Sequence, residues 1–414
     1  MHYSIKTTNK LSANIKLPAS KSISNRALVL HALAKGSSLP QNLSDCDDTD
    51  VMIRALDGLP PHIDIKAAGT AMRFLTALLS VTSGTRLITG TERMRQRPIR
   101  LLVDALRTLG ADIEYAENEG FPPLRITGKT LQSNPITLAG NVSSQYISAL
   151  LMIGATLPNG LQLKLTGDII SRPYINLTLK LMHDFGAKAA WHSPDTIVVE
   201  AGGYQDTSYY IESDWSAASY WYQMMALCPD SESRIELQGL FANSYQGDSR
   251  GAQIFEKLGV ATTYNDNNVL LTKTNCRVER LDEDMVDIPD LAQTFVVTCC
   301  MLGIPFRFTG LQSLKIKETD RIEALKAELA KLGYLIKDEQ NSILSWDGER
   351  CTPCEHPIIA TYEDHRMAMA FAPISLVQGE ITIAHPEVVS KSYPSYWEHL
   401  RQAGFIITEN ESAC

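Results

Sequence analysis

The clearest pattern in the chain is a helix with one apolar stripe, followed by a glycine and then by two short extended segments. Leu325, Leu329 and Leu332 illustrate the stripe, because residues three and four apart share one face of a helix. The glycine stands where the end of a helix needs a positive φ. The pattern recurs around these steps: Leu109-Gly110-Ala111, Phe185-Gly186-Ala187, Leu258-Gly259-Val260, Leu332-Gly333-Tyr334 and Ala403-Gly404-Phe405.

Repeats of this length predict stacked units of helix and strand. A further, shortened copy is expected to begin at Asp48, to pass through Leu56 and Gly58, and to keep only residues 60–66 as its extended part. The long and irregular intervals argue against an open solenoid and favour two closed α/β domains of three units each. The alternative is a chance succession of helix–glycine–strand segments, which the number of copies makes weaker.

Length and composition support two globular domains, since 414 residues exceed one ordinary core and 44% of them are hydrophobic. The net charge of −9 speaks against a general nucleic-acid-binding protein, which would carry a basic surplus. The most apolar window, Thr294 to Phe306, is too short to span a bilayer. Residues 1–17 lack the apolar core of a signal peptide, and the eight cysteines follow no disulfide spacing. We therefore expect a cytoplasmic protein with free thiols and no membrane or nucleic-acid partner.

Basic and hydroxyl side chains gather at predicted helix starts in the first half of the chain. The segment PASKSISNR, residues 18–26, precedes an apolar helix at Ala27–Ala34 and supplies Lys21, Ser22 and Arg26. A helix N-terminus offers unpaired N–H groups and a partial positive charge, so these donors could bind a phosphate there. The alternative is a capped surface helix with incidental basic residues.

Other helix starts in this half carry similar groups. Gly69 precedes a helix at Ala71–Leu79 and would let backbone approach a ligand closely. The arginines of Arg93–Arg97 alternate in a stretch expected to be extended, and Pro98 suits the first position of a helix, which places Arg97 near its start. A solvated charged loop is the alternative. Short polar side chains precede two more helices: Ser143, Ser144 and Gln145 before Tyr146–Met152, and Ser171 and Tyr174 in a second such segment. Each of these alone could be a plain N-cap.

The second half holds an ionisable cluster. Lys317 and Arg321 stand four apart, which would place them on one helix face with Glu318 between cations. Asp290 precedes an apolar helix at Leu291–Met301, where a catalytic carboxylate and an N-cap are equally open readings. Arg366, at the start of a helix at Met367–Phe371, and Lys391 add further cations.

Several common sites are missing from the sequence. His365 has no His or Cys three or four residues away, so we expect no metal site. The chain contains neither a Walker loop nor a dinucleotide-binding glycine pattern. These observations favour an enzyme that acts on two small phosphorylated anions without a nucleotide, a cofactor or a metal.

Together the motifs resemble the 5-enolpyruvylshikimate-3-phosphate synthase family of enolpyruvyl transferases. They occur in the family's order over nearly the whole chain: LPASKSISNR from Leu17, AGTAMR from Ala68, RPI from Arg97, SSQ from Ser143, KETDR from Lys317, DHRMAM from Asp364, and Lys391. The resemblance implies an α/β fold of two domains, each of three βαβαββ units in an inside-out α/β barrel, with a cleft between them. It places a discontinuous first domain at residues 1–20 and 213–414 and an inserted domain at 21–212, in a monomer that closes about a hinge.

The resemblance also implies an activity. The enolpyruvyl group of phosphoenolpyruvate would move to the 5-hydroxyl of shikimate 3-phosphate by addition and elimination, on the route to chorismate. Asp290 would take the hydroxyl proton, Glu318 would protonate the methylene carbon, and Lys21 would complete the catalytic set. Shikimate 3-phosphate would be held by Ser22, Arg26, Ser143, Ser144, Gln145, Ser171, Tyr174, Asp290 and Lys317. Phosphoenolpyruvate would be held by Lys21, Gly69, Arg97, Gln145, Arg321, Arg366 and Lys391.

The chain departs from the family pattern at a few positions. Ala67 and Ser313 stand where the family commonly has Asn, and Phe74 replaces a usual Pro. Gly69 has no methyl group to crowd an inhibitor such as glyphosate, whereas Phe74 could reshape that pocket. Two alternatives remain: the sister transferase that acts on UDP-N-acetylglucosamine, whose reactive Cys is missing from residues 89–97, and a binding module without catalysis.

Overall fold

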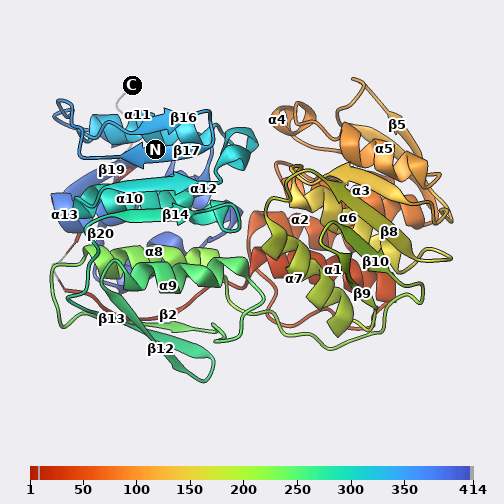
Figure 1. Ribbon diagram of the computed structural model, residues 1–414, viewed down its shortest axis with the longest axis horizontal. Helices are drawn as coiled ribbons and strands as arrows, with labels where there is room; N and C mark the ends of the chain where they lie inside the picture. Colours follow the sequence, from red (N-terminus) through yellow and green to blue (C-terminus); the bar gives the residue numbers. More distant parts are fainter. Residues whose placement is uncertain (8–9, 411–414) are drawn as a thin grey trace. The chain divides into compact units, whose positions relative to one another are not determined.

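The computed structural model describes residues 1–7 and 10–410. Contacts between Cα atoms divide the chain into two compact units, which Figure 1 colours along the sequence. Unit 1 combines Met1–Pro18 with Glu212–Cys414, and unit 2 is Ala19–Ile211. Each unit has its own apolar core.

Five four-stranded sheets share one topology. In four of them the first and second strands along the chain are parallel, the fourth pairs antiparallel with the second, and the third lies at the edge beside the fourth. In the fifth sheet the first strand of the chain, β1 (His2–Lys6), takes the place of that fourth strand. With its helices each sheet makes a βαβαββ unit, so short hairpins alternate with helical crossovers as parallel and antiparallel pairs require. The expected fold class is therefore present.

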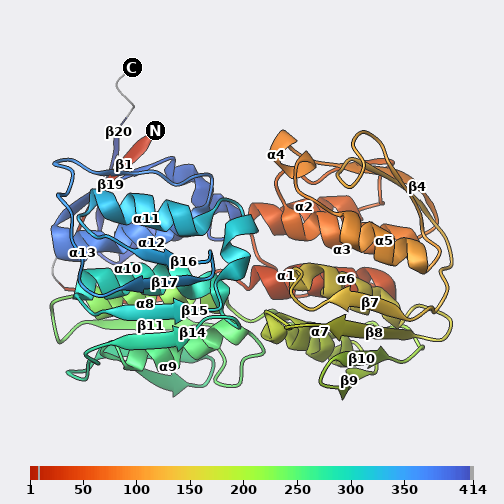
Figure 2. The ribbon, with the colours of Figure 1, turned by 45° about the horizontal axis from the view of Figure 1, so that its top comes forward.

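Unit 1 contains three of these sheets. Their strands, in sheet order, are β2 (Ser12–Lys16), β11 (Arg234–Gln238), β13 (Asn268–Lys273) and β12 (Val260–Asn265); β14 (Leu281–Asp284), β15 (Phe306–Thr309), β17 (Ile343–Trp346) and β16 (Lys337–Glu339); and β18 (Ile358–Ile359), β19 (Glu380–Ala384), β1 (His2–Lys6) and β20 (Ile406–Asn410). Figure 2 shows the N-terminal β1 beside β19 and β20 from the C-terminal end. The first strand of the chain thus completes the last unit.

Three helices of unit 1 are almost entirely buried: α8 (Trp215–Leu227), α10 (Ala292–Leu302) and α12 (His365–Phe371). They pack on one another, and because their apolar residues surround the axis they belong in the core instead of on a surface. The remaining helices are α9 (Gly251–Glu256), α11 (Arg321–Lys331), α13 (Ser375–Gln378) and α14 (Tyr396–Gln402). Short 3₁₀ turns complete the unit: η1 (Gly247–Arg250), η2 (Pro289–Leu291), η3 (Gln312–Ile316), η4 (Ala372–Ile374) and η5 (Pro386–Lys391).

Unit 2 contains the other two sheets. Their strands, in sheet order, are β3 (His62–Asp64), β4 (Gly84–Thr89), β6 (Leu124–Gly128) and β5 (Asp112–Tyr115); and β7 (Ile136–Ala139), β8 (Leu161–Thr166), β10 (Thr196–Val199) and β9 (Ala189–Ser193). The helices are α1 (Lys21–Ala34), α2 (Asp47–Leu56), α3 (Gly69–Val81), α4 (Glu92–Arg95), α5 (Arg100–Thr108), α6 (Ser144–Gly154) and α7 (Arg172–Asp184). Helices α1, α3, α6 and α7 pack together in its core.

The shortened copy differs from the prediction. Helix α2 lies where the copy was expected, but β3 pairs in parallel with β4 and so begins the next unit. Residues 60–66 are therefore not the end of the short copy. Around α1 and α2 the described chain keeps one parallel bridge, Gln41 to Tyr210, in place of a full sheet.

The five repeated glycines end their helices as predicted. Gly110, Gly186, Gly259, Gly333 and Gly404 have φ of 89°, 85°, 87°, 88° and 96°. Only a residue without Cβ adopts this left-handed backbone at little cost, so the glycine sets the turn from helix to strand.

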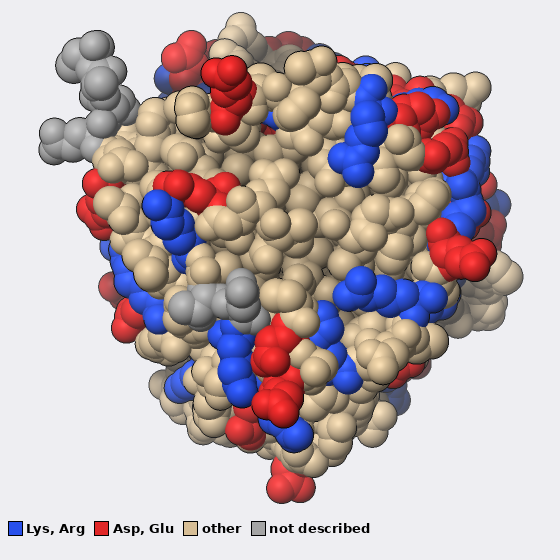
Figure 3. Space-filling view, turned by 90° about the vertical axis from the view of Figure 1, so that its left-hand side faces the viewer, with Lys and Arg blue, Asp and Glu red and all other residues tan. Residues whose placement is uncertain are grey.

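Two surface observations bear on partners. Within residues 1–7 and 10–410, no helix combines the length and the apolar content that crossing a bilayer requires. Figure 3 shows basic side chains next to acidic ones on one face of the molecule, as the mixed composition leads one to expect.

Candidate active site

The predicted residues of the second half meet in one cluster within unit 1. They come from short elements that follow strands: η2 carries Asp290, the turn before α11 carries Lys317 and Glu318, and α11 begins at Arg321. Asp364 caps α12 by accepting a hydrogen bond from the backbone N–H of Arg366 at 2.9 Å. Lys391 ends η5.

Arg321 lies at the centre of this cluster and is 1% exposed. Its Nε and Nη2 donate to the two oxygens of Asp364 at 2.7 and 3.3 Å. Its Nη1 reaches Asp290 Oδ1 at 3.2 Å and its Nη2 reaches Glu318 Oε2 at 2.9 Å. Burial alone would lower the pKa of Arg321, but the three carboxylates outweigh burial and raise it.

Asp290 forms ion pairs with several cationic side chains and does not act as a helix cap. Arg366 Nη2 lies 3.0 Å from Oδ2, and Lys317 Nζ lies 3.5 Å from Oδ1. Helix α10 has Leu291 at its N-cap position, without a side-chain cap bond, so the N-cap reading of Asp290 is wrong. Burial would raise the pKa of this carboxyl, but Arg366, Lys317 and Arg321 together lower it below its usual range.

Glu318 lies between two cations, but they are Arg321 and Lys391 and not the predicted pair of Arg321 and Lys317. Arg321 Nη2 is 2.9 Å from Oε2, and Lys391 Nζ is 3.8 Å from Oε1. The predicted reason was wrong, because Lys317 precedes α11 and does not share a helical face with Arg321. Both reach Asp290 because the chain turns between η3 and α11.

Lys21 belongs to a second group of candidate site residues, which lies in unit 2. The helix starts at Lys21, six residues before the predicted Ala27, so Lys21, Ser22 and Arg26 lie in its first turns. Ser20 caps the helix by accepting from Ile23 N at 3.4 Å. Lys21 Nζ lies 3.4 Å from Asp48 Oδ2. Sequence reasoning used Asp48 only to mark a repeat and missed this pairing.

Arg26 is buried, 3% exposed, among neutral groups. Its Nε donates to Thr178 Oγ1 at 2.8 Å, its Nη2 to Ser148 Oγ at 3.3 Å, and its Nη1 to the carbonyl of Ser22 at 2.9 Å. The ring of Phe74 lies under the guanidinium, 5.3 Å from centroid to Cζ. Burial lowers the pKa of Arg26 to about 10, because a charge among neutral groups is poorly solvated. An anion bound beside Arg26 would stabilise its charged form.

Gly69, Arg97 and Gln145 also come together. A Cβ at Gly69 would lie 2.7 Å from Arg97 Nη1 and 3.0 Å from Arg73 Nη1, so the glycine leaves room for two guanidinium groups. Arg73 Nη1 donates to the carbonyl of Gly69 at 2.9 Å, and Gln145 Nε2 donates to Thr70 Oγ1 at 3.0 Å. Sequence reasoning missed Arg73, although its position four residues after Gly69 in a helix signals the contact.

The stretch around Arg97 differs from the prediction. Glu92–Arg95 is the short helix α4 and not an extended segment, because Thr91 caps it and Met94 is buried. Arg95 pairs with Glu117 at 3.2 Å instead of joining Arg97. Helix α5 begins at Arg100, so Pro98 does not hold its first position.

The remaining predicted residues stand at two helix starts. Ser143 caps α6 by accepting from Gln145 N at 3.4 Å, and Ser144 is the first residue of that helix. Ser171 precedes α7 with a left-handed φ of 54° and makes no side-chain cap bond, so the plain N-cap reading is wrong there. Tyr174 lies in the first turn of α7.

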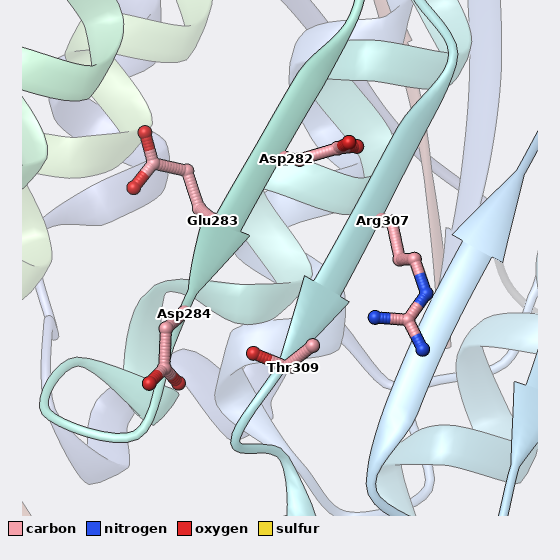
Figure 4. Close-up of a pocket in the computed structure, with 5 residues that line it drawn as sticks. All are labelled: Asp282, Glu283, Asp284, Arg307 and Thr309. Atoms are coloured by element: carbon pink, nitrogen blue, oxygen red, sulfur yellow. The ribbon is translucent and has the colours of Figure 1, made fainter.

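A polar hollow elsewhere on unit 1 has no part in this cluster. Figure 4 shows Asp282, Glu283, Asp284, Arg307 and Thr309 along β14 and β15. Glu283 pairs with Arg250 at 2.9 Å, and Arg307 pairs with Glu339 at 3.2 Å, so these are ordinary surface ion pairs. In the part of the chain that the structure describes, no group of His, Cys, Asp or Glu is arranged to hold a metal ion.

Comparisons with known proteins show the family to which the chain is related. The family described as EPSP synthase (3-phosphoshikimate 1-carboxyvinyltransferase) matches residues 5–63 and 59–400. A 3-phosphoshikimate 1-carboxyvinyltransferase of Bacteroides fragilis is 65% identical over 411 residues, covering 99% of this chain and 100% of the relative. One of Vibrio cholerae is 35% identical, covering 95% and 97%.

A solved structure supports the fold. EPSP synthase from Acinetobacter baumannii superposes with a TM-score of 0.77 at 20% identity, covering 99% of this chain and 100% of that one. The enolpyruvyl transferase NikO of Streptomyces tendae gives a TM-score of 0.70 at 16% identity. At such identities the likeness concerns the fold alone, whereas the family match and the relatives span nearly the full sequence. The chain belongs to the EPSP synthase family.

Proposed function

We propose that this protein is a 3-phosphoshikimate 1-carboxyvinyltransferase, which moves the enolpyruvyl group of phosphoenolpyruvate to the 5-hydroxyl of shikimate 3-phosphate and releases phosphate. The reaction serves chorismate and aromatic amino acid biosynthesis. The observation that carries the proposal is the cluster of two buried arginines, Arg321 and Arg366, and two partly exposed lysines, Lys317 and Lys391, around Asp290 and Glu318. Cations hold anionic substrates there, and two carboxylates supply acid and base.

Each substrate has a proposed set of ligands. Phosphoenolpyruvate is held by Lys21, Gly69, Arg97, Gln145, Arg321, Arg366 and Lys391. Shikimate 3-phosphate is held by Ser22, Arg26, Ser143, Ser144, Gln145, Ser171, Tyr174, Asp290 and Lys317. The two sets draw on both units. We therefore treat residues 1–20 with 213–414, and residues 21–212, as two domains that serve one reaction.

The proposed chemistry balances in two stages. Glu318 gives a proton to the methylene carbon, Asp290 takes the proton of the 5-hydroxyl, and that oxygen forms a bond to C2. The resulting ketal phosphate then loses phosphate as the bond between C2 and the phosphate oxygen breaks. The deprotonated Glu318 takes back a proton from the methyl carbon, and Asp290 passes its proton to the departing phosphate. Lys21 balances charge on the bound anions. General acid–base help of this kind gives about 10²–10⁴ in rate, and positioning supplies more.

Substrate binding also prepares the base. With Arg366, Lys317 and Arg321 around it, Asp290 has a lowered pKa and is a weak base. When a phosphate or carboxylate of a substrate pairs with these cations, their attraction for Asp290 is reduced. The pKa of Asp290 then rises toward that of an ordinary carboxyl. The base thus becomes stronger when the anions are in place.

The remaining properties are proposed from the same set of groups. The donors for both anions are side chains of this chain, so the proposal needs no cofactor and no metal. We propose a cytoplasmic monomer without nucleic-acid or membrane partners. The sister transferase is disfavoured because residues 89–97 contain no Cys, and a binding module is disfavoured because Asp290, Glu318 and Lys21 are all present.

Phosphate release by the purified protein tests the function. We expect release with phosphoenolpyruvate plus shikimate 3-phosphate, and none when UDP-N-acetylglucosamine replaces the shikimate ester. Glu318→Gln should lower kcat at least about 100-fold, because it removes the acid. Its KM for phosphoenolpyruvate should change little, since the neighbouring cations remain.

If the wild-type protein releases no phosphate with shikimate 3-phosphate, the proposed function is refuted. Wild-type turnover by Glu318→Gln would refute only the role of that residue. Asp320→Asn is a matched control, because Asp320 lies two residues away and caps α11 by accepting from Glu323 N at 3.2 Å, a role that asparagine also fills.

A further inference from the structure

The segment that leads from β18 to the start of α12 contains a turn with unusual residues. Thr361 to Asp364 form a turn closed by a hydrogen bond from Asp364 N to Thr361 O at 2.8 Å. Its central residues, Tyr362 and Glu363, both have left-handed backbone, with φ of 54° and 56°. This is the φ pattern of a type I′ turn, which Gly, Asn and Asp normally occupy.

Tyr and Glu adopt that conformation only when surrounding structure holds them there, because Cβ is crowded in left-handed backbone. The turn ends at Asp364, which binds Arg321 and caps α12. Two residues later, Arg366 binds Asp290. Its conformation therefore fixes two side chains of the candidate site.

Side chains on one face of helix α11 bind the segment that contains this turn. Lys331 Nζ donates to the carbonyl of Ile358 at 2.9 Å. Glu328 accepts from Ala360 N at 3.0 Å and from the hydroxyl of Tyr362 at 2.6 Å. Arg321, seven residues before Glu328 and so on the same side of the helix, binds Asp364 at 2.7 Å. Alternate residues of the segment, 358, 360, 362 and 364, are thus tied to one helix.

Glu328 is suited to this task. It is 0% exposed, and Lys331 Nζ pairs with its Oε2 at 2.6 Å, so its charge is neutralised inside the protein. Hydrogen bonds to a charged acceptor are stronger than those between neutral groups. The carboxylate has one oxygen for the Tyr362 hydroxyl and one for the Ala360 N–H.

We propose that Glu328 and Tyr362 are positioning residues, which hold the strained turn 361–364 so that Asp364 and Arg366 are set for phosphoenolpyruvate. This inference rests on the proposed function, because it takes Arg321 and Arg366 as ligands of that substrate. Neither Glu328 nor Tyr362 needs to touch a substrate.

Steady-state kinetics of Tyr362→Phe tests the inference. The variant loses only the hydroxyl that Glu328 holds. We expect KM for phosphoenolpyruvate to rise about tenfold, the effect of one lost hydrogen bond to a charged group. KM for shikimate 3-phosphate should stay within about twofold. Glu328→Gln, which keeps the size of the side chain but can accept at one oxygen only, should show the same selective rise.

Tyr3→Phe is the matched control. It also removes a Tyr hydroxyl that donates to a glutamate of unit 1, Glu409 Oε1 at 3.0 Å, but on the terminal strands β1 and β20. Its two KM values should match those of the wild type. If Tyr362→Phe behaves like Tyr3→Phe while the wild type turns over, the inference is wrong and the proposed function stands. If the wild type itself is inactive, the proposed function is wrong, and the inference that rests on it is wrong as well.

Discussion

At the scale of single residues, the cluster in unit 1 is close to balanced in charge. Lys317, Arg321, Arg366 and Lys391 face Asp290, Glu318 and Asp364. Removing one partner of a buried ion pair typically costs about 3–5 kcal/mol, because the other charge is left buried. Alanine substitutions in the cluster therefore lower stability as well as activity, so the two effects cannot be separated. Amide substitutions such as Glu318→Gln are the better probes.

Asp248 gives a pH-dependent prediction at this scale. It is 5% exposed, and it accepts a hydrogen bond from Ser216. Burial, together with the charge of Asp290, raises the pKa of Asp248 to about 7. The folded protein thus keeps a proton that the unfolded chain loses near pH 4. Between about pH 4 and pH 7 the folded state binds more protons, so its stability falls as pH rises, by at most about 1.4 kcal/mol per pH unit from this group.

Asp248→Asn should remove that slope. Urea midpoints at pH 5 and pH 7.5 measure it, and the variant should lose less stability than the wild type between these values. Asp282→Asn is a control, since Asp282 is exposed and pairs with Arg280 at the surface. Parallel pH profiles of Asp248→Asn and wild type would contradict the prediction.

At the scale of elements, close backbone contacts fix how strands meet helices. Gly128 ends β6, and a Cβ there would overlap the carbonyl oxygens of Leu79 and Thr82 at the end of α3. Backbone atoms at a helix end move less readily than side chains, so the first sheet of unit 2 depends on this glycine.

Gly128→Ala should therefore destabilise the protein by about 1–3 kcal/mol, the usual cost of overpacking. Thermal or urea unfolding measures the change. Gly251→Ala is the matched control, because its new methyl would meet only Leu291 Cδ1, at 2.8 Å, and alanine favours the start of α9. Equal stabilities of the two variants would contradict the argument.

The sequence predicted elements better than contacts. Glycine positions and apolar stripes give the helix ends and the repeat of helix, glycine and two extended segments, because both are local properties. The βαβαββ order of each unit came from the resemblance to a family. The start of α1 was placed at Ala27 instead of Lys21, because polar residues of a first turn look like a preceding loop. The pairing of Lys21 with Asp48 depends on tertiary packing, which spacing along the chain does not reveal. The resemblance to a family, and not the pattern alone, joined the motifs into one site.

At the scale of the whole molecule, the repeats explain how a discontinuous unit is built. Unit 1 begins with β1 and β2, which belong to different sheets, and the chain returns to it at Glu212. The two passages lie side by side, since Asp214 N donates to the carbonyl of Pro18 at 2.9 Å. Glu212 is buried there and accepts hydrogen bonds from Trp215, Phe241, Ser244 and Gln246. The start and the return of the chain are thus fixed to one core.

The central claim of the proposed function is the assignment of Arg97, from unit 2, and Arg366, from unit 1, as ligands of phosphoenolpyruvate. The most direct measurement is KM for phosphoenolpyruvate in Arg97→Ala, from unit 2, and in Arg366→Gln, an amide substitution in the cluster of unit 1, each with its unfolding midpoint recorded. We expect a rise of about 10–100-fold in each folded variant, the effect of one charge-assisted hydrogen bond or more. An unchanged KM in either variant would contradict the claim, because that arginine would then not bind the substrate.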